Sequence, residues 1–395
     1  MVIYVVKKGD TVSSIAAAYG VEADTIIYDN QLPSPYALTV GQALLLSAAE
    51  SFLPGRENGI QNGEIVVPER IEKRAAFIGG YAYPFISRWV LEQTLPFLSD
   101  LYIFSYGFTE EGILIPPLLD DSWMIALAKE YHTAPVMTLT PFGADGKFDN
   151  HLISAVVNDL EARETLKNQI VEQIIQRGFE GLDIDFEFIF AADRQAFVDF
   201  VAYMQAAVSA LGYPVSVALA PKSSADQVGL LYEGKDYRAL GAVADYVLLM
   251  TYEWGYTYGP PMAVAPINKV REVVEYALTE IPAEKINLGI PNYGYDWPLP
   301  FVSGMTKAET IGNIQAVQRA IGYGVPIDFD EIAQSPYFLY AAENRGHEVW
   351  FEDVRSMNAT FGLMEEYGLR GGSYWTIMQL FRANWRLLQE WFEIF

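Results

Sequence analysis

Short apolar runs alternate with longer amphipathic segments over most of the chain beyond residue 70. Eight of the apolar runs are expected as strands: Ala75–Tyr81, Leu101–Tyr106, Pro135–Leu139, Gly181–Phe188, Val215–Ala220, Tyr246–Thr251, Ile286–Ile290 and Gly372–Thr376. Between them, apolar residues recur every three or four positions, which predicts helices. Examples are Thr165–Arg177, Arg194–Leu211, Ile267–Leu278 and Ser356–Tyr367.

Eight strands that alternate with helices over roughly 320 residues predict an α/β fold, the closed (β/α)8 TIM barrel, whose active groups lie on the loops after the strands. The stretch between the seventh and eighth strands is long. We therefore expect residues 297–352 to form an insertion on the same face, within a barrel domain that spans residues 71–395.

The first 47 residues follow a different pattern, in the order strand, helix, helix, strand. These elements are expected at Ile3–Val6, around Ile15–Ala18, at Ala23–Tyr28 and at Ala43–Leu46. Gly9-Asp10-Thr11 has the composition of a turn that caps the first helix. Residues 48–70 mix Gly, Pro, Asn and Glu without a period, as linkers do. The sequence thus predicts a small βααβ domain, a linker and a barrel.

Composition narrows the possible partners. The chain is 51% hydrophobic and 14% aromatic, as in globular proteins, and it lacks an apolar run of the roughly 20 residues that a membrane helix needs. Fifty acidic and 26 basic residues give a net charge of −24, which repels phosphate backbones and anionic lipids. We expect neither nucleic acid nor a membrane as partner, whereas a neutral glycan remains compatible.

Cysteine is absent, which excludes disulfides and thiol nucleophiles. The three histidines, His132, His151 and His347, are not at metal-ligand spacing, so we expect no metal and no cofactor. The chain starts with MVIYVVKKGDTV, where the apolar stretch precedes the basic residues, the reverse of a secretory signal. We therefore expect synthesis in a cytoplasm.

The fourth strand carries the most informative pattern, GFEGLDIDFE at residues 178–187. Successive side chains of a strand point to opposite faces, so Asp183, Asp185 and Glu187 share one face. The apolar face can pack on the outer helices, which turns the acids into the barrel. Burying like charges is costly and raises at least one pKa, which leaves an acid that can donate a proton near neutral pH. The alternative is a strand whose acids face water.

This strand resembles the fourth-strand motif of glycoside hydrolase family 18, Asp-x-x-Asp-x-Asp-x-Glu. Asp183, Asp185 and Glu187 match the last three acids, and Glu180 replaces the first. The resemblance implies that Glu187 is the general acid, that Asp185 positions and stabilises the acetamido group of the substrate, and that Asp183 supports Asp185. It also implies cleavage with retention, in which the N-acetyl carbonyl of the substrate replaces an enzyme nucleophile.

Other strand ends resemble the same family. The element Met250-Thr-Tyr-Glu253 is similar to its Met-x-Tyr-Asp element, with a longer acid at the last position, which implies that the Tyr252 hydroxyl bonds the acetamido oxygen. Trp375 would form the floor under the sugar. Further candidate sugar contacts are Glu253, Tyr81, Tyr106, Asn292, Tyr293, Tyr295 and Trp297.

The N-terminal domain resembles a LysM module. Tyr4, Val6 and residues 9–11 meet the pattern Tyr-x-Val-x-x-Gly-Asp-Thr, and residues 40–42 meet its closing Val-Gly-Gln. Such modules bind glycans that contain N-acetylglucosamine between two loops. The resemblance implies contacts at Gly9, Asp10, Thr11, Val12, Asn30, Gln31, Leu32 and Pro33. The alternative is that Gly-Asp-Thr serves only as a turn and helix cap.

Three further runs, at residues 219–222, 250–262 and 347–353, look like the spore-associated branch of the family, the cortical-fragment lytic enzymes. The resemblance implies an N-acetylglucosaminidase that cuts β-1,4 bonds after N-acetylglucosamine in spore cortex peptidoglycan during germination. We expect a monomer located in the cortex or coat region of the spore. A chitinase and a non-catalytic glycan-binding coat protein of the same fold remain alternatives.

Overall fold

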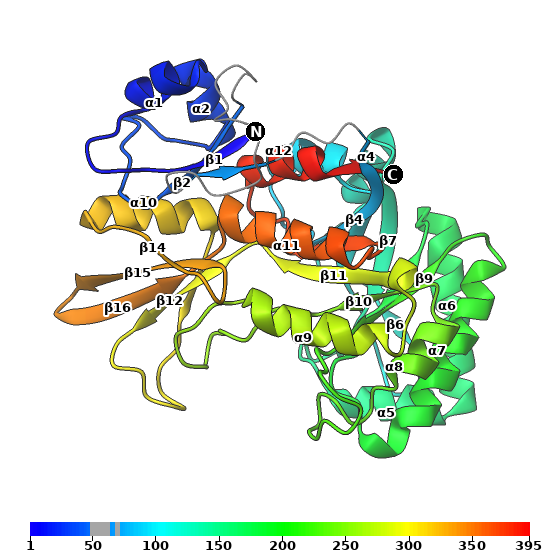
Figure 1. Cartoon of the computed structure of the whole chain (residues 1–395). Coiled ribbons are helices and arrows are strands. Elements are labelled where there is room, and N and C mark those ends of the chain that lie inside the picture. The colour runs from blue at the N-terminus through cyan, green and yellow to red at the C-terminus, as the bar shows by residue number, and fades with distance from the viewer. Residues whose placement is uncertain (48–63, 68–71) are drawn as a thin grey trace.

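The computed structural model describes residues 1–47, 64–67 and 72–395. Its larger part is a barrel of eight parallel strands surrounded by helices, with a small N-terminal domain packed against one side (Figure 1). The barrel strands are β4 (Arg74–Ala82), β5 (Asp100–Phe108), β7 (Ala134–Leu139), β8 (Leu182–Ile184), β9 (Val215–Leu219), β10 (Tyr246–Leu249), β11 (Ile286–Pro291) and β17 (Gly371–Trp375). Because β4 pairs with both β17 and β5, the ring closes, which confirms the predicted fold class.

Helices connect successive strands on the outside of the barrel. They are α3 (Arg88–Thr94), α4 (Ser122–Glu130), α5 (Asn150–Asn158), α6 (Leu160–Arg177), α7 (Arg194–Ser209), α8 (Tyr237–Val243), α9 (Ile267–Leu278), α11 (Val354–Glu366) and α12 (Arg382–Trp391). Two short strands flank the ring: β6 (Leu114–Ile115) pairs with β5, and β18 (Phe392–Ile394) pairs with β4. Short 3-10 turns lie at Leu95–Phe97, Ala191–Asp193 and Ala283–Lys285.

Helix α6 shows how the sequence sets these elements. The Asp159 side chain accepts a hydrogen bond from the backbone N–H of Ala162 and so caps the first turn, and Gly178, at φ +80°, ends the helix. Its buried residues fall on one face at four-residue spacing: Ala162, Leu166, Ile170 and Ile174. The helix ends directly before β8, so it fixes where the acidic strand begins.

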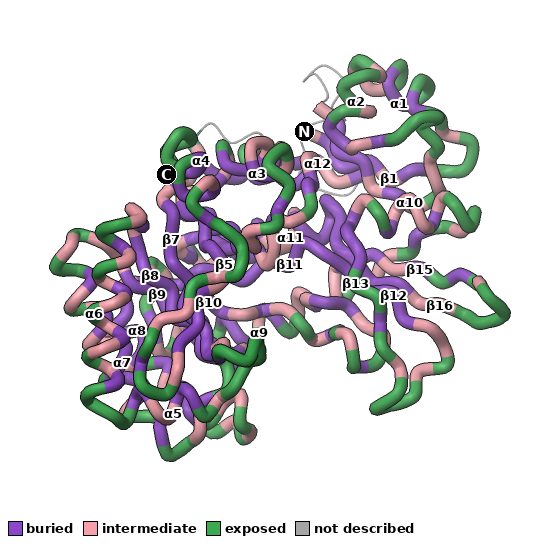
Figure 2. The backbone as a smooth tube through the Cα atoms, turned by 180° about the vertical axis from the view of Figure 1, so that it is seen from behind, coloured by how far each residue is buried: buried purple, intermediate pink, exposed green. Residues whose placement is uncertain are grey.

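Two sets of buried side chains divide the barrel into an outer and an inner layer. Outward-facing strand residues such as Leu182 and Ile184 pack with the helices. The interior is filled by aromatic rings and by the polar groups that bond to them, and its apolar members include Tyr81, Tyr102 and Tyr246. Figure 2 shows the strands buried along most of their length, with the exposed positions on the surrounding helices and loops.

Between β11 and β17 the chain forms a second sheet on the far side from α6 and α7 (Figure 1). Its strands are β12 (Gly294–Pro298), β13 (Glu309–Ile311), β14 (Asp328–Asp330), β15 (Ser335–Ala342) and β16 (Arg345–Trp350), in the order β13-β12-β16-β15-β14, and helix α10 (Asn313–Tyr323) packs on it. The sheet begins a few residues before the expected start of the insertion at residue 297 because β12 follows β11 almost directly.

The N-terminal domain contains β1 (Val2–Val5), α1 (Val12–Tyr19), α2 (Ala23–Asp29) and β2 (Ala43–Leu46). A third strand, β3 (Ile65–Val66), pairs with β1 on the side opposite β2. Most of the segment expected as a linker, residues 48–70, lies outside the described residues. Its described part, residues 64–67, belongs to the N-terminal sheet and is therefore not a linker.

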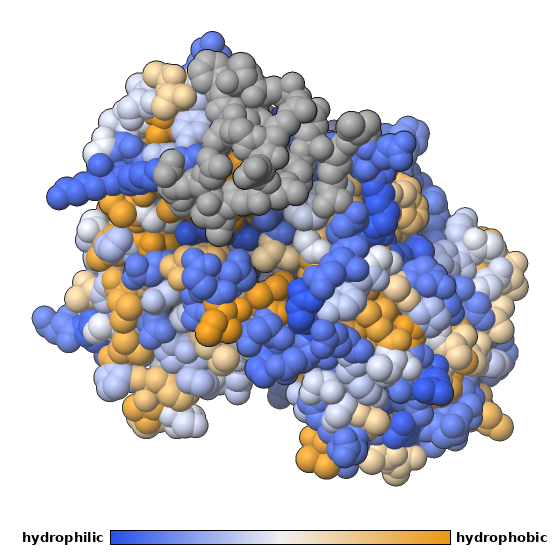
Figure 3. Space-filling view, viewed as in Figure 1, coloured by the Kyte–Doolittle hydropathy of each residue, from blue (hydrophilic) through white to orange (hydrophobic). Residues whose placement is uncertain are grey.

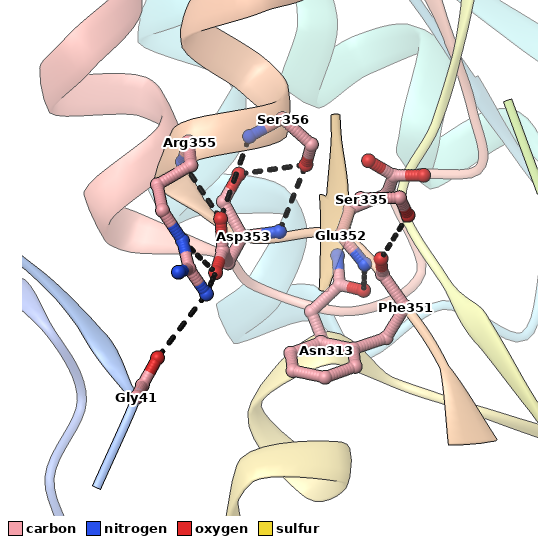
Figure 4. A network of polar contacts seen from close by, with 8 residues as sticks. All are labelled: Gly41, Asn313, Ser335, Phe351, Glu352, Asp353, Arg355 and Ser356. Carbon is pink, nitrogen blue, oxygen red and sulfur yellow. Dashed lines mark hydrogen bonds and ion pairs between the residues drawn. The ribbon is translucent and has the colours of Figure 1, made fainter. Parts of the chain in front are cut away.

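The N-terminal domain is attached to the barrel by direct hydrogen bonds. Ile327 donates its N–H to the Val40 carbonyl at 2.9 Å, and Arg355 donates Nη2 to the Gly41 carbonyl at 3.1 Å (Figure 4). Gly41 has φ +83°, and a Cβ added there would lie 1.8 Å from the Ile327 carbonyl oxygen. Only glycine allows the two backbones to approach this closely.

Among the described residues, no helix combines the length and apolar character that a membrane crossing requires. Hydrophilic residues cover most of the face shown in Figure 3, and apolar residues are scattered between them.

Candidate active site

The three acids of the fourth strand lie at increasing exposure toward one end of the barrel. Asp183 is fully buried and accepts hydrogen bonds from the Tyr81 hydroxyl at 2.9 Å and the Ser216 hydroxyl at 2.6 Å. Asp185 follows the last residue of β8 and is 8% exposed. Glu187 is exposed to solvent. The series leads from the barrel interior to its mouth, at the carboxyl ends of the strands.

Burial and mutual repulsion favour the protonated forms of these acids. Desolvation raises the pKa of Asp183 to about 6, although the hydrogen bonds from Ser216 and Tyr81 oppose it. Desolvation also raises the pKa of Asp185 well above its usual range, and the charges of Glu187 and Asp183 add to the effect. Surrounding protein atoms raise the pKa of Glu187 as well, while the ammonium of Lys235 lowers it. The cluster can therefore hold a proton near neutral pH.

Tyr252 lies across from the acids, after the end of β10. It is half-buried, and desolvation together with the charges of Asp185 and Glu187 raises the pKa of its hydroxyl, which therefore stays protonated and can donate. Gly289 of the neighbouring strand gives the ring its space, since a Cβ there would lie 2.7 Å from Cε1 of Tyr252.

Glu253 follows Tyr252 with a left-handed backbone, at φ +67°. Its Oε1 accepts hydrogen bonds from the Tyr293 hydroxyl and, at 2.9 Å, from the Tyr295 hydroxyl. Desolvation raises the pKa of this carboxyl, the two tyrosines oppose the shift, and Glu187 adds to it. These contacts join the mouth of the barrel to strand β12 of the second sheet.

Trp375, the last residue of β17, is half-buried at the centre of an aromatic cluster. Its ring lies edge-on to Phe104 at 4.9 Å, to Tyr81 at 5.6 Å and to Tyr83 at 6.1 Å between centroids. It contacts Tyr81, which bonds Asp183, and it packs against the same apolar cluster as Tyr252, so its ring lies close to the acids at the mouth of the barrel.

Three expected sugar contacts are buried, and their polar groups bond to protein atoms. Tyr106 is fully buried outside the barrel ring, where its hydroxyl donates to Asp121 at 2.8 Å and accepts from Arg177 at 2.6 Å. Asn292 is 2% exposed and donates to the Thr376 and Gln379 carbonyls. Trp297 is buried, and its Nε1 donates to the Gly259 carbonyl at 2.8 Å. In this structure their polar groups are therefore not free to bond a sugar.

The position of Tyr106 has a structural cause. Alternation along β5 turns Tyr102 and Phe104 inward and would do the same for Tyr106. The pairing of β5 with β7 shifts register between Ile103 and Tyr106, and such an irregularity turns the following side chain to the opposite face.

The sequence interpretation missed Lys235, in the loop between β9 and α8. Its side chain is fully buried, and its charge acts on all three acids. This loop follows β9, the strand next to β8. Its position after a neighbouring barrel strand was the one feature of the sequence that could have pointed to Lys235.

An apolar groove begins next to Trp375, which contacts two of its lining residues, Tyr83 and Phe104, and runs over the ends of β4, β5 and β7. Its lining includes Tyr83, Phe85, Phe104, Pro116, Leu118 and Phe142. Tyr83 contacts both Trp375 and Phe85, and Phe85 is 66% exposed, so a chain of rings leads from Trp375 to the surface. All of the described residues that line the groove are uncharged.

The expected glycan contacts of the N-terminal domain differ in how accessible they are. Gly9, Thr11 and Pro33 are exposed, whereas Val12, Asn30 and Leu32 are buried. Asp10 accepts hydrogen bonds from the Tyr4 hydroxyl and the Lys7 N–H, Thr11 caps α1, and Asn30 ties α2 to β2 through Leu45. Gln31 accepts a hydrogen bond from the Arg382 N–H of the barrel. The exposed members are the ones free to meet a ligand.

Within the described part of the chain, no group of three or more His, Asp or Glu side chains is arranged to hold a metal ion.

Comparisons with known proteins agree with this geometry. The model of the family described as "Glycosyl hydrolases family 18" matches residues 127–379, and the LysM domain model matches residues 4–47. A cortical fragment-lytic enzyme of Bacillus subtilis (strain 168) is 37% identical, with 100% of this chain and 99% of that protein covered.

Solved structures show the same similarity. The Bacillus cereus spore cortex-lytic enzyme SleL superposes with a TM-score of 0.93 at 33% identity, over 100% of this chain and 99% of that chain. A chitinase from Chromobacterium violaceum superposes with a TM-score of 0.73 at 25% identity, over 80% of this chain and 98% of that chain. The chain is therefore a glycosidase that belongs to glycosyl hydrolases family 18 and carries an N-terminal LysM domain.

Proposed function

We propose that this glycosidase cleaves β-1,4 bonds after N-acetylglucosamine in spore cortex peptidoglycan, with retention of configuration. The observation that carries the mechanism is the exposed Glu187 at the barrel mouth next to the buried Asp185 and Asp183, with Tyr252 and Trp375 packed against one apolar cluster beside them. The support for cortex peptidoglycan is the full-length similarity to cortex-lytic enzymes and the LysM domain.

In the first step, Glu187 donates its proton to the glycosidic oxygen as the bond from that oxygen to the anomeric carbon breaks. The raised pKa of Glu187 keeps this proton available. The carbonyl oxygen of the substrate's N-acetyl group attacks the anomeric carbon and forms a cyclic oxazolinium ion. The leaving sugar departs with the proton of Glu187.

Two side chains assist the acetamido group. Tyr252 donates its hydroxyl hydrogen to the acetamido oxygen and holds it in line with the anomeric carbon. Asp185 accepts the acetamido N–H and stabilises the positive charge that develops there, and Asp183 holds Asp185 in place. Trp375 supports the apolar face of the sugar ring.

In the second step, Glu187, now ionised, takes a proton from a water molecule, which attacks the anomeric carbon. The ring of the oxazolinium ion opens, the acetamido group is restored and Glu187 is protonated again. Two inversions leave the product with the β configuration of the substrate.

The apolar groove that begins beside Trp375 suits the neighbouring sugars of a glycan strand. Its aromatic side chains can stack on sugar C–H faces, and its lack of charge does not repel a neutral saccharide. A chitinase activity uses the same chemistry, and the similarity to the Chromobacterium violaceum chitinase keeps chitin as the second candidate substrate.

Mass spectrometry of the products from purified spore cortex tests the proposal, with the wild type and Glu187→Gln compared side by side. We expect fragments that end in N-acetylglucosamine at the reducing end from the wild type and almost none from the variant. Chitin oligomers in parallel reactions distinguish the two substrates. Fragments that end in the other sugar of the strand, or equal release by Glu187→Gln, would contradict the proposal.

A further inference from the structure

Lys235 is a fully buried lysine whose charge acts on all three acids. Its Nζ donates to the Phe186 carbonyl at 2.5 Å and to the Ala218 carbonyl at 2.8 Å. Phe186 is the residue between Asp185 and Glu187, so this ammonium holds the peptide that joins the two acids.

The loop around Lys235 is fixed on both sides. A Cβ added to Gly234 would lie 2.3 Å from the Ile189 carbonyl oxygen, so the loop is pressed against the segment that follows Glu187. On the other side, Asp236 caps α8 through the Ala239 N–H at 3.0 Å and pairs with Arg194 at 2.8 Å. The ammonium is therefore delivered to a set position relative to the acids.

Several ionisable groups surround this ammonium. They are the three acids Asp183, Asp185 and Glu187, Lys222, which donates Nζ to the Lys235 carbonyl at 3.3 Å, the ion pair of Arg194 with Asp236, and the tyrosines Tyr81 and Tyr252, whose hydroxyls interact with the acids. Desolvation lowers the pKa of Lys235 to about 8, and Asp185, Glu187 and Asp183 oppose that shift in this order. Lysine thus stays charged at neutral pH.

A buried ammonium whose hydrogen bonds go to carbonyl oxygens is costly to the fold. A neutral amide could make the same two hydrogen bonds without burying a charge. This cost is offset if the positive charge stabilises nearby negative charge. Here the three acids repel one another, and the ammonium of Lys235 reduces that repulsion.

We infer that Lys235 is a positioning residue of the active site, which fixes the peptide between Asp185 and Glu187 and supplies the positive charge that allows the three acids to keep a negative charge among them. Two experiments test this inference. The first measures kinetics and rests on the proposed function, whereas the second measures thermal stability and does not.

The variants are Lys235→Gln, which keeps hydrogen-bond donors and removes the charge, and Lys285→Gln as the matched control. Lys285 also donates to two carbonyls, those of Gly241 and Ala244 at 2.9 and 2.8 Å, but it lies before β11, at the opposite end of the barrel. Thermal unfolding establishes that each variant is folded before any other measurement.

The kinetic arm is the pH profile of kcat/KM on a short soluble N-acetylglucosamine oligomer. Loss of the positive charge raises the pKa of Glu187, and since Glu187 acts in its protonated form, the high-pH limb should move up by about one pH unit. We expect kcat to fall about 10- to 100-fold with KM changed less than about threefold. An unmoved profile in Lys235→Gln would overturn the inference, even if kcat falls. Lys285→Gln should match the wild type.

The stability arm compares melting temperatures between pH 4 and pH 7. Lys235 is charged throughout this window in both the folded and the unfolded chain, because its pKa is about 8 when folded. The acids have raised pKa values in the folded chain. The stability that they contribute to the folded protein is therefore lost as the pH rises from about 4 through about 6. Without Lys235 this loss is larger, and the gap between wild type and Lys235→Gln should change with pH, to the disadvantage of the variant at pH 7.

If the difference in melting temperature between the wild type and Lys235→Gln is the same at every pH in this window, the inference is overturned. If neither the wild type nor Glu187→Gln releases product, the proposed function fails, and the stability arm still decides the role of Lys235.

Discussion

The three acids of the site differ in how far each is buried, and this fits the different roles that we propose for them. Glu187 reaches solvent, Asp185 is almost buried and Asp183 is fully buried between two hydroxyl donors. The sequence pattern predicted that these acids share a face, because strand alternation is a local property. Tyr252 and Tyr81 were named from the family resemblance, but the bond from Tyr81 to Asp183 was not predicted, since it depends on register between strands distant in sequence.

Tyr252→Phe removes the hydroxyl that we assign to the acetamido oxygen. We expect kcat to fall about 10²- to 10³-fold, the usual effect of removing one donor to a developing charge, with little change in melting temperature. Steady-state kinetics on a soluble oligomer measure this. Tyr256→Phe, at an exposed tyrosine four positions along, is the control and should retain wild-type rates. Equal rates in the two variants would remove the assigned role.

Asp183 should make the stability of the protein depend on pH. Its pKa is raised to about 6 in the folded chain, above the value of about 4 that the unfolded chain has. A raised carboxyl pKa contributes stability below pH 4 that is lost as the pH rises through 6. The melting temperature of Asp183→Asn relative to the wild type should therefore increase between pH 4 and pH 7, whatever its constant offset. Asp199→Asn, at an exposed acid, should run parallel to the wild type.

At the scale of elements, the hydrophobic pattern predicted the eight barrel strands and helices such as α9 at their observed places. The acidic strand was predicted to run to Phe188, whereas β8 ends at Ile184. Alternation looks the same in a paired strand and in an extended segment beyond it, and only the partner strand decides where pairing stops. The register shift in β5, which displaced Tyr106, was hidden for the same reason.

Gly41, just before β2, lies tightly against the barrel insertion. Gly41→Ala should lower the melting temperature and the free energy of unfolding by more than the roughly 1–3 kcal/mol that a left-handed backbone costs a residue with a Cβ, because it also meets the Ile327 carbonyl. Gly9→Ala is the matched control, since Gly9 has φ +93° and nothing within 4 Å of an added Cβ. Equal destabilisation by both variants would show that the contact with Ile327 contributes nothing.

At the scale of the whole molecule, the two domains form one continuous structure rather than two units on a flexible tether. Val40, Gly41 and Gln31 all bond to the barrel or its insertion. The sequence resemblance predicted both domains, which the comparisons confirm. It could not predict their contact, because residues 39–41 and 325–327 are related only through the folded chain.

The exposed loop of the LysM domain should contribute to retention on insoluble substrate. Pro33→Glu should weaken binding to insoluble peptidoglycan about tenfold, which is about 1.4 kcal/mol, and leave the hydrolysis of a short soluble oligomer unchanged. Pull-down assays measure the first and kinetics the second. Ala18→Glu, on the exposed side of α1, is the control. Unchanged retention of Pro33→Glu would argue that the domain serves only as a structural part of the barrel.

The anomeric configuration of the first product tests the central claim most directly. Proton NMR of the wild-type reaction on purified cortex fragments, recorded before the sugars mutarotate, should show the new reducing end as the β anomer. That result follows from attack by the substrate's own acetamido group with Glu187 as acid and then base. An initial α anomer would contradict the account.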